Sequence, residues 1–133
     1  MEINFFGSIN FEYRIYLENL VNDKIKLKFH GHIKQNFLLE QFKKSDLLIF
    51  PSVSEGLPLS AIQALNFGLP VFASYNSNLH EILPDFCIYK TRDPLDFYNK
   101  FLCFMSHKSY SLKNSPHFEE NYIKNKWIEV LCK

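Results

Sequence analysis

The chain has 133 residues, 47% of them hydrophobic and 22% charged, which excludes a disordered chain and predicts one packed domain over residues 1–133. Fifteen basic and fourteen acidic residues give a net charge of +1, so a dedicated nucleic-acid binder is not expected. Three separated cysteines without a C-x-x-C pair indicate neither a disulfide framework nor a zinc site. Because we find no signal-peptide pattern and no apolar run of about 18 residues, we expect a cytoplasmic protein without a transmembrane segment.

The apolar residues alternate along the chain between the spacing of strands and the spacing of helices. Strands are predicted over residues 3–7, 24–29, 47–50, 71–74 and 86–89. Helices are predicted over residues 11–21, after a cap at Asn36, over residues 58–67, after Asp93 and Pro94, and around Trp127. Strands that alternate with helices across short connections favour parallel β-α-β units and a doubly wound, Rossmann-like α/β sheet.

Two patterns in the first third of the chain each have a structural and a functional interpretation. Lys24, Lys26 and Lys28 alternate with apolar residues, and we favour the solvated face of an edge strand over a surface that attracts phosphate or an anionic inner membrane. His30 and His32 stand two apart on a predicted strand and should point the same way. Without a third ligand we predict no bound metal.

The segment before the helix predicted from Pro58 combines a carboxylate with a glycine, Glu55 and Gly56. Gly56 lets the backbone approach a ligand closely, and the free N–H groups at a helix start suit an anionic group such as a diphosphate. Glu55 can accept hydrogen bonds from sugar hydroxyls. In the alternative interpretation, Glu55 and Ser54 only cap the helix, and spacing alone leaves both interpretations open.

Three runs, residues 45–52, 55–59 and 64–71, resemble the donor-site signature of group 1 glycosyltransferases, the large retaining family with the GT-B fold. The resemblance implies the C-terminal, nucleotide-sugar-binding half of that fold. It implies a nucleotide-diphosphate sugar as donor, for which we expect UDP, and a glycan or lipid-linked acceptor in polysaccharide biosynthesis. It implies no cofactor and no metal, and it makes an acceptor-binding domain or chain an expected partner.

The resemblance also assigns roles to individual residues. Glu55, the catalytic candidate, would bind hydroxyls of the donor sugar, and Gln63 would face the ribose where the family usually has a glutamate. Backbone N–H groups after Glu55 would meet sugar or phosphate, and the loop after Gly31 would meet the nucleobase. The binding candidates are Gly56, Leu57, Leu59, Ser60, Gln63, His32 and Ile33.

The chain departs from the family pattern at three places. Gln63 is uncharged, and Ser77 and Asn78 stand where the family has two glycines, although asparagine tolerates the left-handed backbone. Residues 3–7 resemble the second strand of the family's donor half, so its first strand and helix, and the arginine and lysine that follow them, have no match. In the family's order 3-2-1-4-5-6 the unmatched first strand is central. Either residues 3–6 pair directly with the strand of Ile49, or another chain fills the open position between them, and we expect direct pairing.

Three functions follow. The chain is the donor half of a retaining glycosyltransferase that is incomplete alone, a non-catalytic module that binds a nucleotide sugar or a partner subunit, or a generic domain that binds another phosphate ligand after Gly56. Gln63 and the unmatched cations favour the non-catalytic module. The intact run 55–59 argues against the generic phosphate-binding domain. Catalysis by the chain itself is left open. We also expect weak self-association through apolar surface around Trp127.

Overall fold

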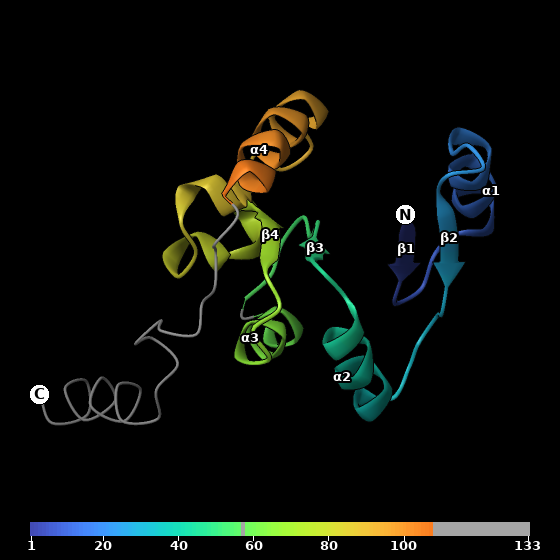
Figure 1. The fold of residues 1–133 in the computed structure, drawn as a ribbon, viewed down its shortest axis with the longest axis horizontal. Coiled ribbons are helices and arrows are strands. Elements are labelled where there is room, and N and C mark those ends of the chain that lie inside the picture. Colours follow the sequence, from blue (N-terminus) through green and yellow to red (C-terminus); the bar gives the residue numbers. More distant parts are fainter. Residues whose placement is uncertain (57, 108–133) are drawn as a thin grey trace, which may run out of the picture. The chain divides into compact units, whose positions relative to one another are not determined.

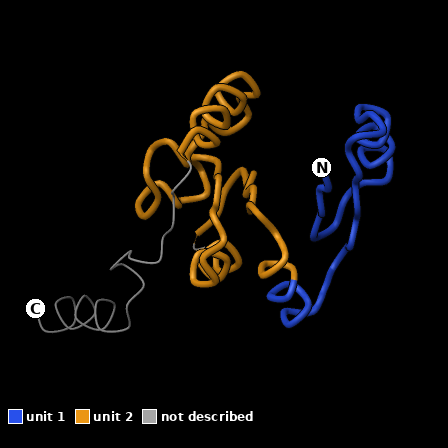
Figure 2. Tube along the Cα trace, viewed as in Figure 1, with its two compact units in different colours: residues 1–40 blue, residues 41–133 orange. Residues whose placement is uncertain are grey.

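The structure is a computed structural model that describes residues 1–56 and 58–107. The chain divides into two compact units, unit 1 with residues 1–40 and unit 2 with residues 41–133 (Figure 2). The helix expected around Trp127, and the self-association expected there, lie outside the described residues. The single domain expected over residues 1–133 stays a prediction.

Unit 1 contains a parallel two-stranded sheet of β1 (Glu2–Phe5) and β2 (Lys26–Phe29), connected by α1 (Phe11–Leu20) (Figure 1). Helix α2 (Gln35–Lys44) follows, and the boundary between the two units falls within it. The register places Phe5 beside Phe29, and their rings stack with centroids 4.8 Å apart. The guanidinium of Arg14 in α1 lies 4.8 Å from the centroid of the Phe29 ring. Helix α1 therefore covers the face of the sheet that carries these aromatic rings.

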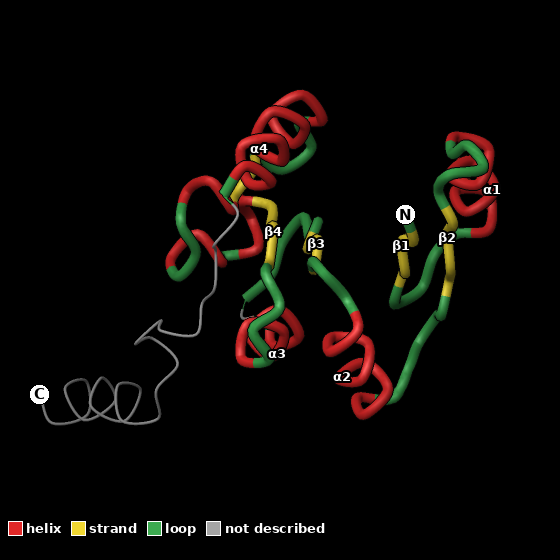
Figure 3. The backbone as a smooth tube through the Cα atoms, in the orientation of Figure 1, coloured by secondary structure: helices red, strands yellow, loops and turns green. Residues whose placement is uncertain are grey.

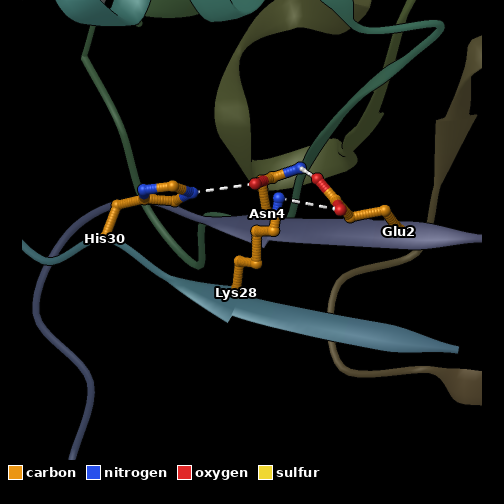
Figure 4. Close-up of polar contacts among 4 residues, drawn as sticks. All are labelled: Glu2, Asn4, Lys28 and His30. Atoms are coloured by element: carbon orange, nitrogen blue, oxygen red, sulfur yellow. Dashed lines mark hydrogen bonds and ion pairs between the residues drawn. The ribbon is translucent and has the colours of Figure 1, made fainter.

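The other face of this sheet carries a connected row of polar side chains (Figure 4). Lys28 Nζ lies 2.8 Å from one carboxylate oxygen of Glu2, and the Asn4 amide donates to the other over 3.1 Å. His30 Nε2 lies 2.8 Å from Asn4 Oδ1. The bonds from Lys28 and then from Asn4 hold the pKa of Glu2 below its ordinary value. Lys28 is thus ion-paired, and its side chain is still 42% exposed on this solvent-accessible face.

In unit 1 the start of α1 is capped by a side chain, whereas the start of α2 is not capped by the side chain expected there. Asn10 Oδ1 accepts the backbone N–H of Glu12 over 2.8 Å at the start of α1. Asn36 was expected to cap the next helix, but α2 already begins at Gln35, so that prediction is wrong. The carbonyl of Lys34 accepts the first backbone N–H groups there instead.

Unit 2 is built on a parallel three-stranded sheet with the order β3 (Leu48–Phe50), β4 (Val71–Ser74), β5 (Ile88–Tyr89). Helix α3 (Leu59–Asn66) connects β3 to β4, and α4 (Pro94–Ser106) follows β5 (Figure 3). Three short 3₁₀ turns lie between β4 and β5, namely η1 (Tyr75–Ser77), η2 (Leu79–Glu81) and η3 (Asp85–Cys87).

The core of unit 2 centres on β4, all four of whose residues are buried. Phe72 is 0% exposed, and its ring contacts three rings of α4, those of Phe97, Phe101 and Phe104. Val71 and Ala73 point to the opposite face because side chains alternate along a strand, and both are also 0% exposed. Strand β4 is therefore covered on both faces, as expected for a strand inside a parallel sheet.

The predicted α/β, Rossmann-like fold class is confirmed by these parallel sheets and their connecting helices. The end of α3 agrees with the sequence, since Gly68 follows with a left-handed φ of +75° and donates its N–H to the Leu65 carbonyl. Strand β5 is shorter than expected, because Phe86 belongs to η3. The described strands form the two sheets above, and the expected pairing of residues 3–6 with Ile49 is in neither of them.

Candidate functional site

Glu55, the candidate catalytic residue, lies in the loop between β3 and α3. Its Oε1 accepts a hydrogen bond from the Ser52 hydroxyl over 2.7 Å. Its backbone N–H donates to the Asn76 carbonyl over 3.2 Å, and its carbonyl accepts from the Asn78 side-chain amide over 2.5 Å. The residue is half-buried. These bonds position the backbone and one carboxylate oxygen, while Oε2 has no partner among the described residues.

The start of α3 is not capped by a side chain from the described part of the chain. Its N-cap is Pro58, which has no side-chain oxygen, and the Glu55 carboxylate bonds to Ser52 instead. The alternative interpretation, in which Glu55 and Ser54 only cap this helix, is therefore wrong. The N–H groups of Leu59 and Ser60 begin the helix and cannot find a partner within it, so they suit an anionic ligand.

The other predicted residues of unit 2 follow Glu55 along the chain. Gly56 is exposed, and a Cβ added there would meet no atom within 4 Å. Leu57 lies outside the described residues. Leu59 is 64% exposed, whereas Ser60 and Gln63 are half-buried. Because residues four apart share one face of a helix, Gln63 lies on the same face of α3 as Leu59.

The loop after β4 is fastened to this segment by side-chain bonds. Asn78 has a φ of +59°, which confirms that asparagine adopts the left-handed conformation at this turn. Its amide donates to the carbonyls of Glu55 and Gly56, the second over 3.2 Å. The Ser74 hydroxyl donates to the Ser52 carbonyl. The loops after β3 and β4 therefore form one connected cluster.

The predicted residues of unit 1 follow β2. His32 is exposed, with its Nε2 2.6 Å from the hydroxyl oxygen of Ser8, and Ile33 is half-buried. His30 bonds to Asn4 instead, and β2 ends at Phe29. The expectation that both histidines lie on one strand is thus wrong.

Sequence reasoning missed Ser8 in unit 1 and Ser52 in unit 2. A signal for Ser8 existed in its place directly after Gly7, where the strand ends and the chain has a φ of +105°. The backbone N–H of Gly7 donates to the Gly31 carbonyl over 2.8 Å, which holds the turn before Ser8. Ser52 has no comparable signal, since its bond to Glu55 depends on the loop conformation.

Over residues 1–56 and 58–107, no group of three histidine, cysteine, aspartate or glutamate side chains could hold a metal ion. Metal-independence stays a prediction. None of the helices in the described residues is long and apolar enough to cross a membrane.

Comparisons with known proteins complete the description of the site. The sequence profile described as "Glycosyl transferases group 1" matches residues 3–107. No curated protein matches the chain. Among solved structures, sucrose-phosphate synthase from Thermosynechococcus elongatus is similar with a TM-score of 0.65 and 18% sequence identity. The similarity covers 97% of this chain but 38% of that one, and it shows the fold of part of a GT-B architecture.

Proposed function

We propose that this chain, which belongs to the glycosyl transferases of group 1, binds a nucleotide-diphosphate sugar of the uridine type as the donor part of a retaining transferase. The acceptor in this proposal is a glycan or a lipid-linked sugar, bound by a further domain or chain. The chain spans 38% of the length of the solved structure that it resembles, so the transfer reaction is part of the proposal.

The observation that carries the proposal is the pairing of a carboxylate with an uncapped helix start. Sugar hydroxyls donate hydrogen bonds, which a carboxylate accepts, and Glu55 has an oxygen without a described partner. Diphosphate oxygens accept hydrogen bonds, which the N–H groups of Leu59 and Ser60 can donate. Each such charge-assisted bond contributes roughly 1.5–3 kcal/mol. The two sets of groups suit the two ends of a sugar diphosphate.

Gln63 and the loop of His32 would complete the recognition of the nucleotide in this proposal. The amide of Gln63 can donate to and accept from the two hydroxyls of a ribose without carrying a charge. Its half-buried position on the face of Leu59 is compatible with this role. The nucleobase contact of His32 and Ile33 stays a prediction from the family resemblance.

Calorimetric titration with UDP and several UDP-sugars tests the location. Gly56→Val should weaken binding about tenfold or more, because its side chain obstructs the approach of the ligand to the backbone. The melting temperature should change little, since an added Cβ meets no atom within 4 Å. Asn66→Ala, at the exposed far end of α3, is the matched control and should bind like the wild type. Equal binding by wild type and Gly56→Val would contradict the location.

A non-catalytic nucleotide-sugar module is the second candidate function, and the neutral Gln63 favours it. Gln63→Glu should change nucleotide affinity at an almost constant melting temperature, since helices accept both residues equally well. Hydrolysis of the bound UDP-sugar would indicate a catalytic site, whereas binding without hydrolysis would favour the module. If Gln63→Glu instead unfolds the protein without changing residual binding, Gln63 is a structural amide.

A further inference from the structure

An exposed aromatic side chain, Tyr75, stands at the same end of the sheet as the candidate site. It is the first residue of η1 and directly follows β4, at the carboxyl end of a parallel strand, where sheets of this class bind ligands. Tyr75 is 54% exposed although the four preceding residues are all buried. The sequence-derived site does not include it.

His80 holds the ring of Tyr75 in one orientation. The two rings stack with centroids 4.3 Å apart and an interplanar angle of 13°. His80 Nδ1 lies 3.1 Å from the Tyr75 carbonyl oxygen, and because a carbonyl only accepts, Nδ1 carries the proton. A ring that is already ordered loses little conformational entropy when a ligand covers it.

Hydrogen bonds tie this stacked pair to the loop of Glu55. Asn76, the next residue after Tyr75, accepts the Glu55 N–H with its carbonyl over 3.2 Å. Its own N–H donates to Thr91 Oγ1 over 3.1 Å. Asn78 holds the carbonyl of Glu55 on the other side of the same turn. A flat ring surface and a carboxylate therefore belong to one braced loop cluster of unit 2.

We propose that Tyr75, supported by His80, is a stacking platform for the pyranose ring whose hydroxyls bind Glu55. A hexose has an apolar face of C–H groups and a rim of hydroxyls, so it needs a flat apolar surface beside a hydrogen-bond acceptor. Nucleobases also stack on aromatic rings, but a carboxylate acceptor matches the hydroxyl rim of a sugar. The inference rests on the proposed function, because it names the residue that recognises the sugar of the donor.

The test compares binding of UDP with binding of UDP-glucose and UDP-galactose by calorimetry. Tyr75→Ala should lower the affinity for at least one UDP-hexose about fivefold to tenfold, the loss expected for one aromatic contact, and leave UDP affinity unchanged. Tyr75→Phe keeps the ring and should bind like the wild type. Tyr98→Ala removes another exposed tyrosine, 58% exposed on α4, and serves as the matched control.

Two results would overturn the platform while leaving nucleotide binding in place. One is an equal loss of UDP and UDP-hexose affinity in Tyr75→Ala, and the other is no loss for any hexose. If the wild type binds neither UDP nor UDP-hexose, the proposed function is wrong. Saturation-transfer NMR with methyl hexosides then tests whether Tyr75 binds a sugar ring without the nucleotide. Transfer that disappears in Tyr75→Ala supports it, and absence of transfer to the wild type overturns it.

Discussion

Units 1 and 2 are built from the same kind of parallel strand, yet different interactions stabilise them. In unit 2 the strand β4 is buried along its whole length, and Phe72 is surrounded by aromatic rings. Among residues 1–40 no residue is buried, and α1 has apolar side chains that are more than half exposed, including Phe11 and Leu20. Unit 1 depends on its backbone ladder, ring stacking and polar bonds, each of which contributes about 1 kcal/mol or less.

The comparison shows why the loops of unit 2 are the better support for a ligand site. Ser52, Glu55 and Asn78 bond to one another in the loops after β3 and β4, and β4 is buried along its whole length. A binding group is most effective when its neighbours hold it in place. The His32 loop of unit 1 is held by a Gly7–Gly31 backbone bond and the contact of Ser8 with His32. We therefore expect the sugar diphosphate to be recognised mainly by unit 2.

The largest expected effect comes from the core of unit 2. Phe72→Ala should lower the free energy of unfolding by about 3–5 kcal/mol, because it removes a fully buried ring and leaves a cavity. The matched change in unit 1, Phe29→Ala, removes a half-buried ring and should cost roughly 1–2 kcal/mol. Hydrogen exchange at the amides of β4 and β2 measures both. Equal losses of protection would break the contrast between the units.

An intermediate effect is expected from Tyr89 of unit 2 at alkaline pH. Burial raises the pKa of Tyr89 to about 12 from its ordinary value of 10.0. Below pH 10 the hydroxyl is protonated in the folded and unfolded chains alike, so its contribution to stability is fully present. Between pH 10 and 12 only the unfolded chain releases the proton readily, so the free energy of unfolding should fall as the pH rises through this interval.

Chemical unfolding between pH 9 and 12 checks this prediction, with Tyr89→Phe as the control. The variant lacks the titrating hydroxyl and should lose less stability over the same interval, since lysines and other tyrosines titrate in both proteins. Identical pH profiles for the two proteins would show that ionisation of Tyr89 is not linked to folding.

The smallest expected effect concerns the polar row of unit 1. The pKa of Glu2 is lowered by its bond to Lys28 and then by its bond to Asn4. The contribution of Glu2 to the stability of the fold is therefore present above the pKa that Glu2 has in the unfolded chain. It is lost as the pH falls through the lowered pKa of the folded chain. Glu2→Gln should abolish this acid dependence, and salt should reduce it in the wild type because both partners are solvent-accessible. Titration of the Lys28 and Leu27 amides by NMR between pH 2 and 6 measures it. A Glu2 with an unshifted midpoint would contradict the ion pair.

Local signals in the sequence predicted most element boundaries. Gly68 ends α3, and Asp93 Oδ1 accepts the Asp96 N–H over 2.9 Å at the start of α4, both as expected from turn and cap chemistry. The prediction that Asn36 caps α2 was wrong, because the backbone carbonyl of Lys34 accepts the first helical N–H groups. Such competition between a side chain and a neighbouring carbonyl is decided by the backbone path, which residue types alone do not determine.

The candidate site divides in the same way between local and tertiary features. Glu55, Gly56 and the left-handed turn at Asn78 could be identified because each depends on residue type beside a strand or helix end. The hydrogen bonds from Ser52 and Asn78 to Glu55 could not be predicted from the sequence. The Asn78 bond joins segments whose proximity depends on the pairing of β3 with β4, and the Ser52 bond depends on the loop conformation. Tyr75 and His80 are not separated by the spacing that places two side chains on one face of a strand or helix. The pattern of the sequence therefore did not predict that their rings stack.

We propose that a nucleotide sugar binds at the loop cluster after β3 and β4. Titration of UDP-hexose into the ¹⁵N-labelled 133-residue chain tests it most directly, because each backbone amide reports its own surroundings. We expect the largest shift changes at Gly56, Leu59, Ser60 and Asn76, with small changes in the amides of β1 and α1. Saturable binding whose shifts lie elsewhere and leave these four amides unchanged would contradict the account.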